Sequence, residues 1–219
     1  MIIAIDGPAG SGKSTIAKLI ASELGFEYLD TGAMYRMVTL DLVTKNISFE
    51  NIKSIVRELK NIKIDIINNR FYLNGVDVSS DIRKPIVSEN VSKVAKIKEV
   101  RDRMVDLQRE ISKSKNTILD GRDIGTVVFP NAEIKIYLIA DEKERAKRRY
   151  SELKGNDNSI TFDKVLENII ERDRIDSTRE ESPLKKAQDA IQIDTTGKTI
   201  EEVKKEILLV INEKNEEIK

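Results

Sequence analysis

The chain has 219 residues, which is enough for one large domain or two small ones. Lysine plus arginine and aspartate plus glutamate each total 38, so the formal net charge is zero, and this disfavours a general nucleic-acid binder with its usual basic excess. Cysteine and histidine are both absent, which excludes disulfides, thiolate metal sites, a cysteine nucleophile and the usual general base near neutral pH. Any catalysis must therefore rest on lysine, arginine and aspartate side chains and on a metal ion.

A phosphate-binding loop lies near the start of the chain. Residues 7–14 fill every fixed position of the pattern G-x-x-x-x-G-K-[ST]. An apolar run at 2–5 precedes the loop and apolar residues follow it at helical spacing, so the loop joins a strand to a helix over 13–24. Glycines let backbone N–H groups approach a phosphate, Lys13 can reach the β- and γ-phosphates, and the Ser14 hydroxyl can ligate Mg²⁺. The sequence therefore predicts a nucleoside triphosphate site formed by Gly7, Pro8, Ala9, Gly10, Ser11, Gly12, Lys13, Ser14 and Thr15.

A short strand at 26–29 and a helix from Thr31 continue the pattern. Ser48 is the predicted N-cap of the next helix, whose apolar face carries Phe49, Ile52, Val56 and Leu59. The pattern then changes to three short strands separated by polar turns, of which Asn74-Gly75 is a strong hairpin signal. This small antiparallel sheet interrupts a β/α chain, so we expect it to be an insertion. Its strands lie at 62–67, 71–73 and 76–78, with the other turn at Asn68-Asn69.

Helices and strands alternate through the rest of the chain. Asp141 is the predicted N-cap of a helix, with Glu144 as its capping-box partner, and Thr199 with Glu202 opens the last helix in the same way. The helix from Thr161 is expected to turn Val165, Ile169 and Ile170 inward. The remaining predicted elements are helices at 85–94 and 98–112, strands at 117–120, 134–139 and 190–193, and a polar loop at 155–159.

Strands that alternate with helices predict an α/β fold with a five-stranded parallel sheet flanked by helices. Ligands of such sheets bind beyond the carboxyl ends of the strands, so we expect Gly7, Asp30-Thr31 and Asp120 to Asp123 to converge. The chain enters a strand at once, without a charged and then apolar leader, and no apolar run reaches the length of a membrane span. We therefore expect a cytoplasmic protein with no membrane partner.

Three groups of charged residues are candidates for chemistry. Asp120 ends an apolar strand and is a candidate Mg²⁺ partner, with Arg122 and Asp123 beyond it, although a polar turn with surface charges would look the same.

The second group lies on predicted helices. Arg172, Asp176 and Arg179 would share one helix face if the helix extends that far, and Arg145, Arg148 and Arg149 form a similar set. Arginines beside the polar loop could close over phosphates, or they could form intrahelical ion pairs on a solvated face. Residues 31–36, with Thr31, Tyr35 and Arg36, suit an anion at a helix start, although Tyr35 could equally be packing.

Four blocks together resemble the bacterial cytidylate kinase family. They are G-P-A-G-S-G-K-S, D-T-G-A-M-Y-R, D-G-R-D-I-G-T-V-V-F-P and E-R-D-R-I-D-S-T-R, in this order, and the similarity runs from Met1 to about Ile211. The resemblance implies a P-loop NTPase fold that transfers the γ-phosphoryl group of ATP to CMP or dCMP with Mg²⁺ as cofactor. It also implies a core at about 1–30, 113–149 and 174–219, a nucleoside-monophosphate-binding insertion at 31–112 and a short lid at 150–173. We expect a monomer with no nucleic-acid partner.

The resemblance also implies roles for individual residues. The acceptor phosphate falls to Thr31, Tyr35, Arg36, Arg122 and Arg179. The cytosine falls to Ser92, Arg101 and Asp123, and the ribose to Arg172 and Asp176. Thr31 stands where the family often has serine, and it keeps the hydroxyl. The expected catalytic residues are Lys13, Arg122, Arg149 and Arg179, and the expected metal-site residues are Ser14 and Asp120.

Three other functions remain open at the level of sequence. The first is a kinase for another small acceptor, such as UMP, AMP or shikimate. The second is a GTPase switch, although the chain has no Asn-Lys-x-Asp guanine motif. The third is a nucleic-acid-dependent ATPase, which the neutral charge disfavours.

Overall fold

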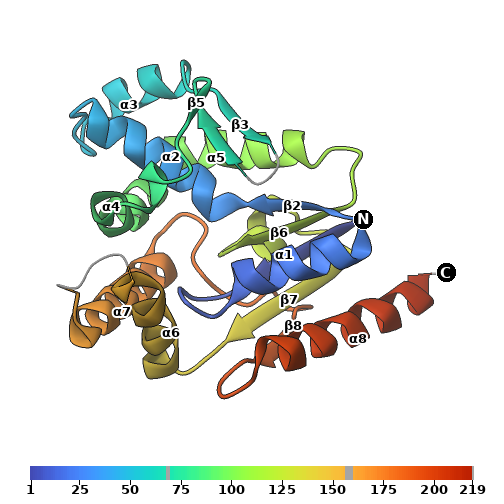
Figure 1. Ribbon diagram of the computed structural model, residues 1–219. Coiled ribbons are helices and arrows are strands. Elements are labelled where there is room, and N and C mark those ends of the chain that lie inside the picture. The colour runs from blue at the N-terminus through green and yellow to red at the C-terminus, as the bar shows by residue number, and fades with distance from the viewer. Residues whose placement is uncertain (68–69, 156–159, 219) are drawn as a thin grey trace. The chain divides into compact units, whose positions relative to one another are not determined.

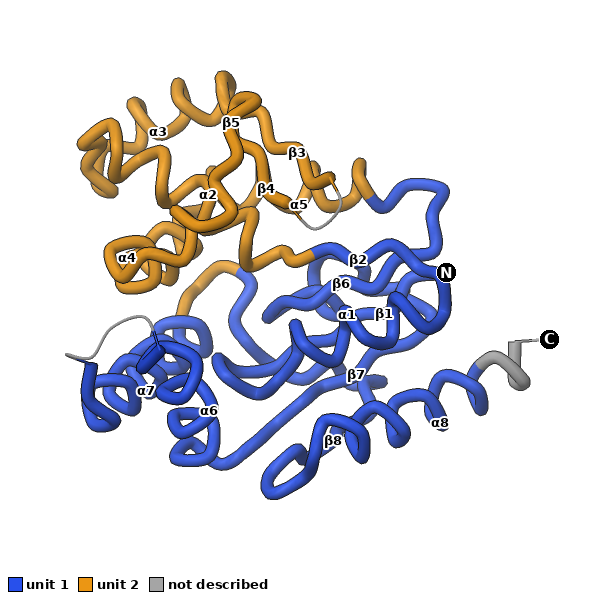
Figure 2. Tube along the Cα trace, in the orientation of Figure 1, with its two compact units in different colours: residues 1–29, 112–178, 182–219 blue, residues 30–111, 179–181 orange. Residues whose placement is uncertain are grey.

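The computed structural model describes residues 1–67, 70–155 and 160–218, with side chains through residue 214. The chain divides into two compact units, each described here by itself (Figure 2). Unit 1 comprises residues 1–29, 112–178 and 182–219, and unit 2 comprises residues 30–111 and 179–181. Residues 150–173 fall within unit 1, and their movement as a lid stays a prediction. The expected turn at 68–69 and the expected loop at 156–159 lie outside the described residues.

A five-stranded parallel sheet forms the centre of unit 1, in the order β2-β6-β1-β7-β8 (Figure 1). The central strand β1 (Ile2–Asp6) pairs on one side with β6 (Thr117–Gly121) and on the other with β7 (Ile134–Ile139). The outer strands are β2 (Glu27–Asp30) and β8 (Ile191–Asp194). The central strands are nearly continuous apolar runs, as expected for a parallel sheet covered on both faces. The predicted fold class is therefore confirmed.

Helices α1 (Lys13–Leu24) and α8 (Ile200–Ile218) pack side by side against the sheet of unit 1 (Figure 1). Their apolar faces and the strands form one core, which includes Ile5, Ile16, Ile20, Ile136 and Ile207. Unit 1 also holds the helix pair α6 (Glu142–Lys154) and α7 (Phe162–Thr178), and a π-helical segment η2 (Ile124–Val128). Among the described residues, no helix combines the length and the apolar character needed to cross a bilayer.

The helix caps of unit 1 partly match the predictions. The capping box of α8 is confirmed, because the Thr199 N–H donates to Glu202 over 2.8 Å and the Glu202 N–H donates to the Thr199 hydroxyl over 3.3 Å. Asp141 caps α6, but the side chain of Glu144 does not accept the Asp141 N–H, which donates instead to the hydroxyl of Thr196.

The predicted inward placement of Ile170 is wrong, since its side chain is 43% exposed.

Unit 2 combines four α-helices with a small antiparallel sheet. The sheet order is β3-β4-β5, and its Asn74-Gly75 turn has φ of 51° and 83° at the two residues, the double left-handed geometry of a tight hairpin. The predicted Ser48 cap is wrong, because the side chain of Asn51 accepts the Ser54 N–H and α3 begins at Ile52, so Phe49 lies before the helix. The elements of unit 2 are α2 (Thr31–Thr44), α3 (Ile52–Leu59), β3 (Ile64–Ile67), β4 (Arg70–Leu73), β5 (Val76–Asp77), η1 (Asp81–Arg83), α4 (Pro85–Ala95) and α5 (Lys98–Ile111).

Candidate active site

The phosphate-binding loop occupies the turn between β1 and α1, and two of its glycines are required by close packing. A Cβ on Gly7 would lie 2.1 Å from the carbonyl oxygen of Leu138 in β7. Gly10 has φ of 76°, and a Cβ there would lie 3.1 Å from the carbonyl oxygen of Arg145 in α6. The loop can therefore pass between β7 and α6 only because both positions lack a side chain.

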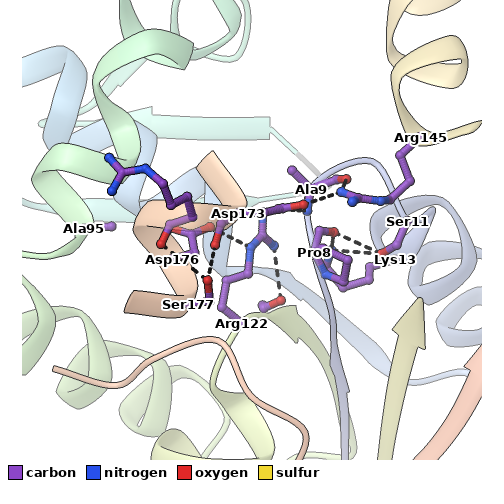
Figure 3. Close-up of polar contacts among 12 residues, drawn as sticks. Pro8, Ala9, Ser11, Lys13, Ala95, Arg122, Arg145, Asp173, Asp176 and Ser177 are labelled. Carbon is purple, nitrogen blue, oxygen red and sulfur yellow. Dashed lines mark hydrogen bonds and ion pairs between the residues drawn. The ribbon is translucent and has the colours of Figure 1, made fainter. Parts of the chain in front are cut away.

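Lys13 is buried in this loop and is 5% exposed. Its ammonium group donates to the Pro8 carbonyl over 2.6 Å and to the Ser11 hydroxyl over 3.2 Å (Figure 3). Burial lowers the pKa of Lys13 well below its ordinary value and the nearby Arg122 lowers it further, while the carboxylates of Asp120, Asp173 and Asp6 act in the opposite direction. A bound phosphate would supply further negative charge that favours the protonated form.

Ser14 and Asp120 lie together at the ends of two neighbouring elements. The Ser14 hydroxyl donates to one oxygen of Asp120 over 2.7 Å, and the hydroxyl of Tyr28 donates to the other over 2.8 Å. A hydroxyl and a carboxylate are oxygen donors of the kind that Mg²⁺ prefers, and this ion usually takes only one or two protein ligands beside phosphates and waters. The two residues therefore fit the ion that the sequence predicts. Tyr28 was not predicted, because the bond spans 92 residues and no local pattern marks it.

Arg122 and Asp176 form an ion pair. The Arg122 Nε donates to Asp176 over 2.9 Å, and its Nη1 donates to the Gly121 carbonyl over 3.2 Å (Figure 3). Burial by itself would lower the pKa of Arg122, but Asp176, Asp173 and Asp120 outweigh burial and raise the pKa above its ordinary value. Two residues predicted to bind different parts of the acceptor are thus in direct contact in unit 1.

Asp173, which the sequence analysis did not select, fixes α7 to the phosphate-binding loop. Its carboxylate accepts the Ala9 N–H over 3.0 Å and pairs with Arg145 (Figure 3). Arg145, only 4% exposed, also donates to the carbonyls of Ala9 over 2.8 Å and Ala140 over 3.0 Å. The Ala9 residue is therefore held through both its N–H and its carbonyl, by side chains from α7 and α6.

The three arginines of α6 do not form one shared group. Arg148 donates to the Thr195 carbonyl over 2.6 Å and to the Thr195 hydroxyl over 3.0 Å, so it fixes the loop after β8. Arg149 instead pairs over 2.8 Å with Glu152, whose side chain is 61% exposed. Of the three, Arg149 has the most solvent-exposed ion-pair partner, and such pairs contribute little to stability.

Asp6 is a second buried carboxylate that the sequence analysis did not select. It lies at the end of β1, is 4% exposed, and accepts the N–H groups of Ile124 over 2.9 Å and Gly125 over 2.7 Å. Burial raises the pKa of Asp6 to about 7, and Asp123 adds to this shift, whereas the two N–H groups and Lys13 oppose it. Both N–H groups lie more than 115 residues away in the chain, so only the fold could reveal this contact.

Unit 2 brings together several of the residues predicted to bind the acceptor. The guanidinium of Arg101 lies 5.2 Å from the centre of the Tyr35 ring and donates to the Ala95 carbonyl over 3.0 Å. Ser92 is buried on α4, which packs against α2 and α5, the helices that carry Tyr35 and Arg101. Thr31 begins α2, where the side chain of Asp30 accepts the Ala33 N–H as the N-cap, and Arg36 lies in the same helix.

The predicted set of Arg172, Asp176 and Arg179 lies only partly on one helix. Arg172 and Asp176 are on α7, but this helix ends at Thr178, so Arg179 follows its end and belongs to unit 2. The conditional prediction of one helix face for all three residues therefore holds for two.

Thr15 lies in the first turn of α1 and is exposed, next to Ser14.

Comparison with known proteins places this arrangement in a family. The family model described as cytidylate kinase matches residues 3–213. A cytidylate kinase of Fusobacterium nucleatum subsp. nucleatum is 63% identical over 203 residues, which are 93% of each chain, and one of Clostridioides difficile (strain 630) is 51% identical over 97% of this chain and 98% of that one.

A solved structure supports the fold alone. An uncharacterized protein of Eubacterium ventriosum ATCC 27560 is 14% identical, with a TM-score of 0.55 over 97% of this chain and 98% of that chain. The family assignment rests instead on the full-length match to the family model and on the identity to the curated relatives. The chain belongs to the cytidylate kinase family.

Proposed function

We propose that this chain transfers the γ-phosphoryl group of ATP to CMP or dCMP, giving CDP or dCDP and ADP. The observation that carries the proposal is the family match over residues 3–213. Within the matched region, the phosphate-binding loop places Lys13 on the Pro8 carbonyl and the Ser14 hydroxyl on Asp120. An oxygen of the acceptor phosphate attacks the γ-phosphorus, and the bond from that phosphorus to the β–γ bridging oxygen breaks. A phosphate monoester is already a nucleophile at neutral pH, so the absence of histidine is no obstacle.

Lys13 is proposed to bind the β- and γ-phosphates. To do so its ammonium must exchange the Pro8 carbonyl and the Ser11 hydroxyl for phosphate oxygens. The backbone N–H groups of residues 7–15 and the start of α1 supply further donors and a partial positive charge. Positioning and charge neutralisation are then the main catalytic contributions of this loop.

Mg²⁺ is proposed to be held by the Ser14 hydroxyl and by Asp120, directly or through water. The ion would neutralise charge that develops between the β- and γ-phosphates. Ser14 and Asp120 already share a hydrogen bond of 2.7 Å, and Tyr28 orients the remaining Asp120 oxygen. Tyr28 would thus keep the carboxylate turned toward Ser14.

The acceptor nucleotide is proposed to bind the residues that the resemblance to the family implies. Arg122 and Arg179 would bind its phosphate with Thr31, Tyr35 and Arg36. The Arg122–Asp176 pair supports this assignment, because a carboxylate that orients a guanidinium reduces the freedom lost when phosphate binds. The ribose would lie on Arg172 and Asp176, and the cytosine on Ser92, Arg101 and Asp123.

Arg149 is proposed to contact the transferring phosphoryl group when the segment at 150–173 closes as a lid. Arg145 and Arg148 donate to backbone carbonyls of unit 1, whereas Arg149 pairs with the exposed carboxylate of Glu152, three residues away. Exchanging that surface pair for a phosphate has little cost in free energy. A monomeric state, a cytoplasmic location and independence of nucleic acid complete the proposal.

Coupled production of ADP with each nucleoside monophosphate at equal concentration tests the function. CMP and dCMP should give kcat/KM values roughly tenfold or more above those of UMP and AMP, since one well-placed base contact is worth about 1–3 kcal/mol. Equal rates with UMP or AMP would overturn the proposed acceptor. Hydrolysis of GTP without any acceptor would indicate a switch instead, and stimulation by DNA or RNA would indicate a nucleic-acid-dependent ATPase.

A further inference from the structure

The carboxylate of Asp6 caps a segment that lies more than 115 residues away in the chain. Its two oxygens accept the N–H groups of Ile124 and Gly125 over 2.9 and 2.7 Å. These are the first two residues of the π-helical segment η2 (Ile124–Val128), whose opening N–H groups have no partner within the helix. A strand-end residue of β1 therefore supplies the cap that a helix start normally receives from its own chain neighbour.

Asp123 occupies the position from which a cap is ordinarily made. It is the residue immediately before η2, and aspartate is among the most favoured residues there because its side chain can accept the N–H groups of the first turn. The Asp123 side chain makes no such cap bond, while its backbone carbonyl accepts the N–H groups of Val127 over 2.9 Å and Val128 over 3.2 Å. Asp6 thus takes over the capping role and Asp123 keeps only the backbone part of it.

Lys135 also packs against the start of this segment. A Cβ on Gly125 would lie 3.1 Å from Cδ of Lys135 and 3.4 Å from an oxygen of Asp6, so both side chains lie close to the place where Gly125 lacks a side chain. Lys135 is itself fixed, because its ammonium donates to the Pro130 carbonyl over 2.5 Å and to Asp189 over 2.7 Å. The start of η2 therefore has little freedom to shift along or across the end of the sheet.

We propose that Asp6 is a positioning residue for the choice of acceptor base. By capping η2 in place of Asp123, it fixes where the Asp123 carboxylate stands and keeps that carboxylate from turning onto the N–H groups of Ile124 and Gly125. The inference rests on the proposed function, in which Asp123 accepts a hydrogen bond from the N4 amino group of cytosine. Uracil presents an oxygen at that place, so a correctly placed carboxylate attracts one base and repels the other.

The isosteric variant Asp6→Asn tests this role. It keeps one accepting oxygen but replaces the other with an amide NH₂, which cannot accept an N–H, so one cap bond is lost and Asp123 can replace it. We expect kcat/KM for CMP to fall roughly 5- to 20-fold, mainly through KM for CMP, because a contact to the base edge is weakened. The value for UMP should fall less, so the CMP/UMP ratio should drop. Because Asp6 also interacts electrostatically with Lys13, any change in KM for ATP should be the same with both acceptors and should leave the ratio unaffected.

Two further variants make the test specific. Gly125→Ala places a methyl group against the side chains of Asp6 and Lys135 and should therefore also lower the CMP/UMP ratio. This second variant keeps the proposal testable if Asp6→Asn does not fold. Thr199→Ala removes the cap of α8, a contact elsewhere in unit 1, and should leave the ratio unchanged. An equal fall for CMP and UMP in both Asp6→Asn and Gly125→Ala would mean that Asp6 only stabilises the fold, and would overturn the proposal.

The double variant Asp6→Asn/Asp123→Ala separates this inference from the function on which it rests. If Asp6 acts through Asp123, the double variant should have the CMP/UMP ratio of Asp123→Ala alone. A further drop of the ratio in the double variant would overturn the proposal, because Asp6 would then act by another route. An unchanged ratio in Asp123→Ala would refute the assignment of cytosine to Asp123, and the role of Asp6 with it. A changed ratio in Asp123→Ala beside an unchanged ratio in Asp6→Asn would refute only the role of Asp6.

Discussion

At the scale of single residues, Lys13 is a cationic side chain in a buried position. Its ammonium is buried, bonded to its own loop, and has a lowered pKa because burial disfavours the charge. Truncation by Lys13→Ala removes the cation that would face the transferring phosphoryl group but removes no part of the apolar core. We expect turnover to fall roughly 100- to 1,000-fold or more, as for the loss of one transition-state donor, with an unchanged circular dichroism spectrum. The exposed Lys205→Ala on α8 is the matched control, and near-normal turnover of a folded Lys13→Ala protein would refute the role of Lys13.

The predictable residues of the site are those that are contiguous in the chain. Residues 7–14 and the block at 120–123 could be recognised because one loop needs specific residue types at adjacent positions. Asp6, Tyr28 and Asp173 could not be recognised, because each acts on a partner 92 to 164 residues away. A single carboxylate or phenol carries no local signal of such a partner.

At the scale of elements, Asp173 links α7 to the phosphate-binding loop by a hydrogen bond and to α6 by an ion pair. Asp173 accepts the Ala9 N–H and pairs with Arg145, whose side chain is 4% exposed. Asp173→Asn would leave that buried guanidinium without its carboxylate, so we expect a loss of about 2–4 kcal/mol in the free energy of unfolding, measured with urea. Arg174→Gln on the same helix breaks a pair that is 63% and 54% exposed, and it should change the free energy by less than about 0.5 kcal/mol. Equal effects of the two variants would mean that the pair does not anchor α7.

Sequence patterns predicted whole elements better than their ends. Every predicted strand and helix exists, because periodicity over several residues reports which face is buried. Apart from the exposed Ile170, the errors lie at helix caps, where several polar residues can fill one position. Ser48 and Asn51 both suit an N-cap, and Thr196 rather than Glu144 accepts the Asp141 N–H because β8 brings it close. Such competition is decided by tertiary contacts, which a local pattern does not contain.

At the scale of the whole molecule, the buried Asp6 links stability to pH. Its pKa is raised to about 7 in the folded chain, from 3.8 when exposed. Below pH of about 4 the carboxyl is protonated in both states and the shift has no effect. Between about 4 and about 7 the unfolded state releases the proton first, so this group makes the folded state less stable as pH rises. Burial is the main cause of this raised pKa; the N–H groups of Gly125 and Ile124 oppose it, the charge of Asp123 adds to it, and Lys13 opposes it.

Asp6→Asn should remove this pH dependence because an amide does not titrate. The free energy of unfolding of the variant minus that of the wild type should therefore rise between pH 4 and pH 7, by up to roughly 4 kcal/mol at 1.36 kcal/mol per unit of pKa shift. Urea denaturation of both proteins at several pH values in this window measures the difference. A flat or falling difference would show that Asp6 is not protonated in the folded chain near neutral pH.

The strand order of unit 1 has a consequence for how the chain can fold during synthesis. The central strand β1 is made first, yet its two neighbours are β6 and β7, at Thr117–Gly121 and Ile134–Ile139. On the ribosome, β1 must therefore remain without its hydrogen-bonding neighbours until residues 117–121 have been made. Meanwhile residues 30–111, which form nearly all of unit 2 as one continuous stretch, can collapse on their own. Unit 1, which holds the phosphate-binding loop, is thus begun before unit 2 and completed after it.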